Sequence, residues 1–389
     1  MEKKFIDPKY FLSPIVLINL LFFGCSAHES SLISSRYVFS SYINTPGVTQ
    51  EEKDAIARIR KTNDTLIYGM PLSTEAFKDI NGDIRGFTTL FCEWLTKIFD
   101  ITFQPALYEW NDLLAGLESG EISFTGELTA REERQKIYHM TSAIAMRPLK
   151  YFRLSNAKPL DEIMKDRPIR CGFIQGTATI LTVSSELEPG TFEAVILNDV
   201  SHVYDALNSG RIDAFYYTGT SEINFIEYND VSAFYFYPLI YRPVSLSTQN
   251  DALKPIISVV DKILSTEGSL HYLTTLYNQS HTEYMKHKVQ MQLTEEEREY
   301  IRNNPIVPIG VDPGNYPGSF YDAREKNWSG VSLDILNEIS RLTGLNFKRI
   351  NDEHTQWPEI FEMLKNGDVI IVNELTQSND RAQHFIWPK

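Results

Sequence analysis

Apolar and polar residues follow one another in the same order at two distant places in the chain. At each place a short apolar run predicts a β-strand, over Leu66–Gly69 and over Val307–Val311. Each strand is followed by a stretch with apolar residues at helical spacing, over Leu90–Phe99 and over Leu333–Thr343. The pattern therefore predicts a strand and an amphipathic helix in both places.

Both places begin with the same helix signal. Thr49 precedes Glu52 by three residues, and Thr294 precedes Glu297 by three residues, 245 positions further on. A Thr and a Glu at this spacing form a capping box, in which each side chain accepts a hydrogen bond from a free backbone N–H group. We therefore expect short helices over 53–61 and 298–303.

The two places share further residues in the same order. From the tryptophan onward, the offset between partners is 247 residues. The pairs are Gly86 and Gly330, Trp110 and Trp357, Gly120 and Gly367, Glu127–Thr129 and Glu374–Thr376, and Arg134 and Arg381. An ordered set at a nearly constant offset indicates an internal duplication.

These motifs, together with Leu117–Gly120, Ile169–Thr177 and Ala206–Ala214, make a family resemblance visible. Each unit resembles the family 3 periplasmic solute-binding proteins, two-lobed "Venus flytrap" domains that often bind amino acids. The resemblance implies α/β lobes with mainly parallel sheets. It also implies two strands that cross between the lobes, near Tyr151–Leu154 and Leu239–Arg242, and a ligand cleft that closes by a hinge motion.

The resemblance divides the chain into one complete flytrap copy and a truncated second copy. We expect a signal peptide or membrane anchor over 1–25, and a linker with a short helix over 26–63. Solute-binding domain 1 then covers 64–288, with lobe 1 at about 64–152 and 240–288 and lobe 2 at about 153–239. A linker helix over 289–304 leads to the first lobe of domain 2, over 305–389.

The N-terminal segment has the pattern of an export signal. A basic start precedes the apolar run Phe11–Cys25, which is too short for an ordinary membrane span and fits the apolar region of a signal peptide. Gly24–Cys25 resembles the end of a bacterial lipoprotein signal, although Phe23 departs from it. Cys25 is therefore a candidate for lipidation, which would attach the chain to a membrane.

The resemblance also implies ligand-binding residues in the first cleft. Arg134 matches the arginine that holds an α-carboxylate, because a guanidinium presents two parallel donors. Thr129 would add a hydroxyl donor, and Thr177 lies at an expected helix N-terminus that favours an anion. Trp110 and Phe77 match aromatic positions that enclose the ligand side chain.

Two positions depart from the family pattern. The carboxylate that holds a ligand amine would fall at Thr218, which is not an acid, whereas Glu127 occupies a place that is usually small or apolar. Two interpretations of Glu127 stay open: it neutralises Arg134, or it holds a cationic group of the ligand. The candidates in the second unit are Tyr316, Trp357, Glu374, Thr376 and Arg381.

Composition narrows the functional classes. The net charge of −14 and the absence of a basic block make nucleic acid a poor candidate partner. Three widely spaced cysteines give no disulfide framework. No catalytic motif occurs, so we expect a non-enzymatic chain that needs no cofactor and whose partner is a small amino acid or other carboxylate.

Three functions remain open from the sequence. The first is the sensory part of a bacterial receptor, such as a sensor histidine kinase or diguanylate cyclase, at the periplasmic face of the membrane. The second is a lipoprotein that delivers solute to an uptake permease. The third is a flytrap domain attached to a lytic transglycosylase or a flytrap-type dehydratase. We expect the 389 residues to be part of a longer receptor with a C-terminal signalling domain.

Overall fold

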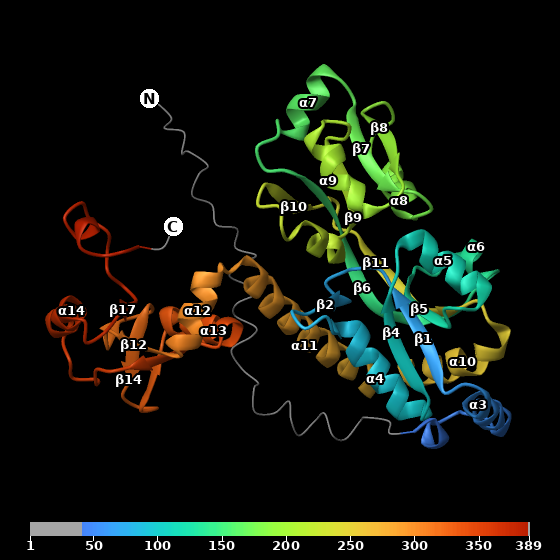
Figure 1. The fold of residues 1–389 in the computed structure, drawn as a ribbon, viewed down its shortest axis with the longest axis horizontal. Helices are drawn as coiled ribbons and strands as arrows, with labels where there is room; N and C mark the ends of the chain where they lie inside the picture. Colours follow the sequence, from blue (N-terminus) through green and yellow to red (C-terminus); the bar gives the residue numbers. More distant parts are fainter. Residues whose placement is uncertain (1–40, 388–389) are drawn as a thin grey trace, which may run out of the picture.

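The computed structural model describes residues 41–387. The predicted signal segment and its Cys25 lie outside the described residues. Within 41–387, no helix is long and apolar enough to cross a membrane. Figure 1 shows a larger unit, coloured blue through yellow, and a smaller orange-to-red unit beside it.

The larger unit is built on one sheet in two parts. In the first part, β1 (Thr65–Met70) pairs in parallel with β4 (Thr102–Leu107) and β5 (Phe124–Leu128), and the strand order is β4-β1-β5-β11-β6. β11 (Tyr241–Thr248) and the long β6 (His139–Leu154) complete this part. We name the body around β4, β1 and β5 lobe 1.

β6 continues into the second part of the sheet, which we name lobe 2. Its other strands are β7 (Ile169–Ile174), β8 (Phe192–Leu197), β9 (Ala214–Thr218) and β10 (Val231–Tyr235). β7 pairs in parallel with β8 and β9, while β6 pairs antiparallel with β9, β10 and β11. The expectation of mainly parallel sheets is therefore wrong at the centre, because the strands that cross between the lobes run against their neighbours.

Helices cover both lobes. In lobe 1 they are α3 (Gln50–Thr62), α4 (Phe87–Phe99), α5 (Trp110–Ser119), α6 (Glu132–Gln135) and α10 (Lys254–Leu264). In lobe 2 they are α7 (Leu160–Asp166), α8 (Thr179–Glu186) and α9 (Val203–Asn208). The short elements are β2 (Phe77–Lys78), β3 (Ile84–Arg85) and the 3-10 turns Tyr42–Asn44, Val200–His202, Gly219–Phe225 and Asp251–Leu253.

The core of lobe 1 follows from the sequence of α4. Phe87, Phe91, Leu95 and Phe99 recur every four residues and are at most 2% exposed, so one face of the helix is fully buried. The helix begins after Gly86, whose φ of 104° and ψ of −170° belong to a region that is almost reserved for glycine.

Both predicted capping boxes are confirmed, and the first also joins two helices. Thr49 and Glu52 exchange hydrogen bonds at the start of α3. The Glu52 carboxylate additionally accepts a hydrogen bond from Ser258 at 2.7 Å and pairs with Lys262 at 2.5 Å, both on α10. Glu52, in the first turn of α3, therefore also ties this helix to α10.

The smaller unit repeats local features of lobe 1. β12 (Ile306–Gly310) pairs in parallel with β16 (Asn346–Arg349) and β17 (Ile371–Val372), so the order β16-β12-β17 matches β4-β1-β5. Its helices are α12 (Glu295–Asn303), α13 (Val331–Thr343) and α14 (Trp357–Asn366), with the small sheet β13 (Gly314–Asn315), β14 (Ser319–Asp322) and β15 (Asn327–Ser329) and the turn Arg381–Gln383. Trp110 and Trp357 each open a helix, and Gly120 and Gly367 end those helices at φ of 82° and 80°.

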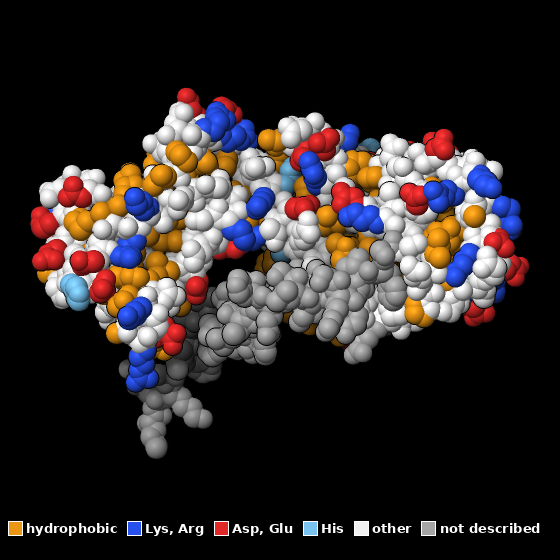
Figure 2. Space-filling model, turned by 90° about the horizontal axis from the view of Figure 1, so that it is seen from below, with side chains coloured by type: hydrophobic (Ala, Val, Ile, Leu, Met, Phe, Trp, Pro, Cys, Tyr) orange, Lys and Arg blue, Asp and Glu red, His pale blue; other side chains and the backbone are white. Residues whose placement is uncertain are grey.

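A single long helix connects the units. α11 (Glu267–Gln292) packs against α4 of lobe 1 and α13 of the smaller unit, and Thr294 then begins α12. The helix runs past 288, the expected end of solute-binding domain 1, to Gln292. Figure 2 shows acidic and basic side chains interspersed with apolar ones over one face of both units.

Candidate functional site

The cleft between the lobes holds two small cavities. One has a volume of about 30 Å³ and the other about 20 Å³. Trp110, Glu127, Tyr217 and Thr218 line both. Such volumes admit a water molecule or two but no amino acid, so the lobes are closed on each other.

The cavity walls come from the carboxyl ends of strands, where α/β folds place ligand sites. Glu127 and Thr129 lie at the end of β5, Thr177 lies after β7, and Thr218 ends β9. Trp110 opens α5. Side chains far apart in the sequence therefore meet because parallel strands of both lobes end at the cleft.

Six of the seven candidates in the first unit line the 30 Å³ cavity: Trp110, Glu127, Thr129, Arg134, Thr177 and Thr218. Phe77 lies elsewhere. It is 1% exposed and packs against Tyr284 and His287 of α11, with ring centroids 5.8 and 4.7 Å away. In the described structure it is part of the contact between lobe 1 and α11, not of the cleft wall.

The second-unit candidates do not share one cavity among the described residues. Arg381 lines an open groove of about 1510 Å³ beside Phe361, and its Nη1 donates to the carbonyl of Thr376 at 3.0 Å. Glu374 instead accepts hydrogen bonds from Asn315 and Ser332. Tyr316 is 76% exposed, and Trp357 stacks on Phe361.

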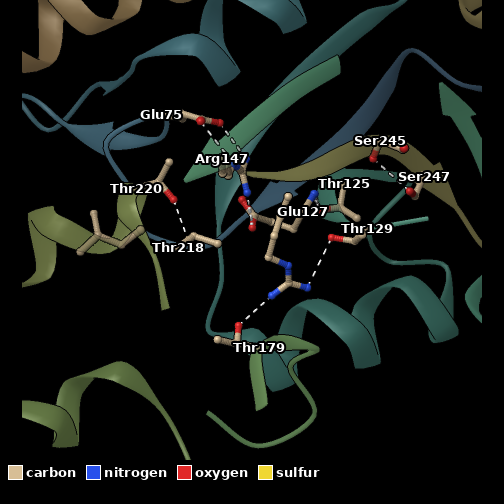
Figure 3. A network of polar contacts seen from close by, with 12 residues as sticks. Glu75, Thr125, Glu127, Thr129, Arg147, Thr179, Thr218, Thr220, Ser245 and Ser247 are labelled. Atoms are coloured by element: carbon tan, nitrogen blue, oxygen red, sulfur yellow. Dashed lines mark hydrogen bonds and ion pairs between the residues drawn. The ribbon is translucent and has the colours of Figure 1, made fainter. Parts of the chain in front are cut away.

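A buried arginine that the sequence analysis missed organises the cleft. Arg147 of β6 is 1% exposed; its Nε and Nη2 donate to Glu75 at 3.2 and 2.7 Å, and its Nη1 donates to Glu127 at 2.6 Å. Tyr277 of α11 also donates to Glu75, at 2.7 Å. Figure 3 shows Arg147 between the two glutamates.

This network corrects one interpretation of Glu127. Its partner is Arg147 and not Arg134, so Glu127 does not neutralise the predicted carboxylate anchor. Burial raises the pKa of Glu127, the charge of Arg147 opposes this, and the charge of Glu75 adds to it. Oε1 of Glu127 is buried and has no hydrogen-bond partner in the described structure.

Arg134 and Arg242 bring positive charge to the same cavity. The Arg134 guanidinium lies 6.0 Å from the centroid of the Trp110 ring. Burial lowers the pKa of Arg134, and the charge of Arg131 lowers it further. Burial likewise lowers the pKa of Arg242, together with Arg131 and Arg134, to about 10.

Arg242 is the second cleft residue that the sequence analysis missed. It lies on β11 and is 8% exposed; Nη1 donates to Thr179 at 2.8 Å, and Nη2 donates to Thr129 at 3.5 Å. Its signal in the sequence is an Arg-Pro pair inside an apolar strand, and Arg147–Pro148 has the same form.

The 30 Å³ cavity therefore offers several donors, and the only acid among its described lining residues is Glu127, whose carboxylate binds Arg147. Besides the arginines, the indole Nε1 of Trp110 is buried and has no hydrogen-bond partner in the described part of the chain. Within 41–387, no group of three or more His, Cys, Asp or Glu residues is placed to hold a metal ion. The chemistry that this arrangement supports is the binding of an anion.

Hydrogen bonds between the lobes keep the cleft closed. The backbone N–H of Thr74 donates to the carbonyl of Thr220 at 2.8 Å. Arg131 of lobe 1 donates to Ala178 and Thr182 of lobe 2 at 3.4 and 3.3 Å. A ligand larger than water enters only when these contacts open.

Comparison with known proteins agrees with the predicted resemblance. Residues 307–387 match the family described as bacterial extracellular solute-binding proteins, family 3. The periplasmic VFT2 domain of BvgS from Bordetella pertussis has the same fold; the match covers 60% of this chain and 99% of that one, at 14% identity and a TM-score of 0.50. No curated protein matches the chain.

Two further solved structures match less closely by TM-score. A mutant of ArgBP from T. maritima is 17% identical, with 58% of this chain and 99% of that one covered and a TM-score of 0.45. AbpA from Streptococcus pneumoniae, an amino acid ABC transporter substrate-binding protein bound to L-arginine, is 14% identical, with 58% and 98% covered and a TM-score of 0.47. The family match falls on the smaller unit.

Proposed function

Because residues 307–387 match the family 3 solute-binding proteins and the chain has the flytrap fold, we propose that it is an extracytoplasmic sensory module that closes on a small carboxylate-bearing ligand. The observation that carries the proposal is the Arg134 guanidinium. It lines the cleft beside Trp110, and within 41–387 no carboxylate lies within ion-pair distance of it.

A carboxylate would relieve the cost of this arrangement. Burial and the charge of Arg131 disfavour the charged form of Arg134, and a bidentate carboxylate supplies the missing partner. The hydroxyl of Thr129 and the indole N–H of Trp110 line the same cavity as neutral donors, whereas the hydroxyl of Thr177 already donates to the carbonyl of Ile174 at 2.8 Å. The ligand would thus exchange water for a preformed set of donors.

Two contacts of α11 support a sensory role over that of a free-standing carrier. Lys288 on this helix pairs with Glu222 of lobe 2 at 2.6 Å, so movement of lobe 2 changes a contact of the helix. The same helix packs on α13 of the smaller unit. Opening and closing of the cleft would therefore reach the smaller unit through α11.

Membrane attachment through the N-terminal segment is part of this proposal. Mass spectrometry of membrane-extracted protein should show an N-terminal peptide that begins at a lipid-modified Cys25. A freely soluble protein cleaved beyond Cys25 would contradict lipid attachment. This result would not bear on whether the cleft binds a carboxylate.

The ligand proposal is tested by a thermal-shift screen of the full chain. The compounds are amino acids, dicarboxylates, small peptides and their uncharged amide analogues. The variant Arg211→Gln removes an exposed arginine of lobe 2 and serves as control: it should respond to the same compounds as the wild type. We expect at least one carboxylate to raise the Tm and its amide analogue to have no effect. A screen without any carboxylate hit would contradict the proposal, and so would amides that act equally well.

A further inference from the structure

Arg242 is a buried cation that has no ion-pair partner among the described residues. Its guanidinium is held by two threonine hydroxyls, Thr179 from lobe 2 and Thr129 from lobe 1, which are neutral acceptors. Within the described residues, no carboxylate oxygen lies within ion-pair distance of it. A buried charge without a counter-charge is costly, and proteins rarely keep one without a reason.

The nearby acids are already used or lie apart from it. Glu75 and Glu127 both bind Arg147, so two carboxylates serve one guanidinium. The second oxygen of Glu127, Oε1, has no hydrogen-bond partner among the described residues and lines the same cavity, but it lies beyond ion-pair distance of Arg242. Glu109 and Asp199 line only the other, 20 Å³ cavity. Asp199 is hydrogen-bonded to Ser201 and paired with His202 at 3.0 Å, and Glu109 is exposed to solvent.

The 30 Å³ cavity therefore has two cationic walls, Arg134 and Arg242, that the protein leaves unneutralised. A ligand with one carboxylate pairs with only one of these guanidinium groups and leaves the other without an ion-pair partner. We propose that the ligand of this cleft carries two carboxylates, one bound by Arg134 and the other by Arg242. This inference rests on the proposed function and adds the substrate class and a specificity-determining residue.

The competing role for Arg242 is a latch between the lobes. Its bond to Thr179, which begins α8, crosses the cleft, so the side chain also joins lobe 1 to lobe 2. A latch acts on every ligand alike, because closure follows the binding of any of them. A second anchor acts only on ligands that have a second carboxylate, so comparing matched ligands separates the two roles.

The test is isothermal titration calorimetry on the full chain with succinate, butyrate and sulfate. The variants are Arg242→Gln, Arg242→Lys and the exposed control Arg211→Gln. We expect the wild type and the control to bind succinate at least tenfold more tightly than butyrate. Arg242→Gln should lose this preference through weaker succinate binding alone, and Arg242→Lys should restore part of it because the charge returns without the planar fork.

The stability of the free protein gives a second readout. Arg242→Gln should leave the Tm unchanged or raise it, because it removes a buried cation beside Arg131 and Arg134. An equal loss of succinate and butyrate binding, or a lower Tm with the preference for succinate intact, would show a latch and overturn the proposal.

Two other outcomes would also overturn it. Equal affinity for succinate and butyrate in the wild type would leave the proposed carboxylate-binding function standing but remove the second anchor. Sulfate bound as tightly as succinate would show that any compact dianion suffices, and it would overturn the assignment of two carboxylates. Failure of every carboxylate to bind would instead contradict the proposed function itself.

Discussion

Arg147 and Arg242 lie directly opposite each other on the antiparallel strands β6 and β11. Like charges in directly opposed positions destabilise a sheet, because their side chains project from the same face. Arg147 is neutralised by Glu75 and Glu127, whereas Arg242 has only hydroxyl partners within the described chain. The strands that join the lobes thus bring an uncompensated positive charge to the cleft, and an anion entering the cleft would reduce the repulsion.

Loss of Arg147 should destabilise the fold strongly. Arg147→Met would leave the carboxylates of Glu75 and Glu127 buried without their cation, and breaking a buried ion pair in this way costs about 3–5 kcal/mol. Urea unfolding of the full chain measures the change in the free energy of unfolding. The control Arg211→Gln should stay within about 0.5 kcal/mol of the wild type, since surface substitutions rarely do more. An Arg147→Met variant as stable as this control would contradict the network.

Glu52 should make stability fall in acid. Burial raises its pKa, but hydrogen bonds from Lys262, Ser258 and the Thr49 backbone outweigh burial and hold the pKa at about 2, below the ordinary 4.5. A carboxylate with a lowered pKa in the folded state contributes stability above pH 4.5, and this contribution is lost as the pH falls from 4.5 toward 2.

The measurement is the Tm of the wild type and of Glu52→Gln between pH 6 and pH 3. The wild type should be more stable at pH 6, and the difference should shrink as the pH falls below 4.5. Glu51→Gln is the matched control, because Glu51 is an exposed neighbour on the same helix turn. A difference that stays constant over this range would contradict the assignment.

Gly86 should resist replacement more than Gly120 does. A Cβ at Gly86 would lie 2.5 Å from the carbonyl oxygen of Glu75, at a φ of 104°. We expect the strained backbone of Gly86→Ala alone to lower the free energy of unfolding by about 1–3 kcal/mol. The contact between the new Cβ and the carbonyl oxygen of Glu75 should lower it further. Gly120→Ala, at a φ of 82° with no atom within 4 Å, should cost about 1–2 kcal/mol. Equal Tm values for the two variants would show that the backbone of Glu75 does not pack as described.

The contact between Lys288 and Glu222 should carry ligand closure to α11. Hydrogen exchange of the full chain with and without succinate should show slower exchange over 284–303 in the wild type. Lys288→Ala should lose this response while stability changes by about 1 kcal/mol or less, as for a partly exposed ion pair. Lys286→Ala, which removes an exposed lysine of the same helix, should keep the response. A response that survives in Lys288→Ala would contradict the relay.

The local sequence predicts much of the fold because its signals are short-range. The capping boxes at Thr49 and Thr294 form as expected, and Gly86 and Gly330 precede helices α4 and α13. Each of these features depends on residues a few positions apart, so periodicity and turn chemistry suffice to find them. The antiparallel pairing of β6 with β11 was not foreseen, because it joins residues about a hundred positions apart.

The cleft could be predicted only in part, for a related reason. Arg134 and Thr129 were found through the repeat and the family resemblance, but Arg147 and Arg242 lie outside both repeated motifs. An arginine inside an apolar strand shows no partner in the sequence, and its partner Glu75 is 72 positions away. The sequence marks Glu127 as unusual, but its pairing with Arg147 depends on where β6 places that side chain, which no local pattern specifies.

If Arg134 anchors a carboxylate between the lobes, its loss must weaken ligand binding, and titration calorimetry of Arg134→Gln measures this change. The ligand is the strongest carboxylate hit of the thermal-shift screen, and Arg211→Gln is the control. Loss of a charge-assisted bidentate contact, worth about 1.5–3 kcal/mol for a hydrogen bond to a charged group, predicts at least a tenfold weaker affinity with the Tm of the free protein unchanged. An affinity in Arg134→Gln equal to that of the wild type would show that Arg134 does not anchor the ligand.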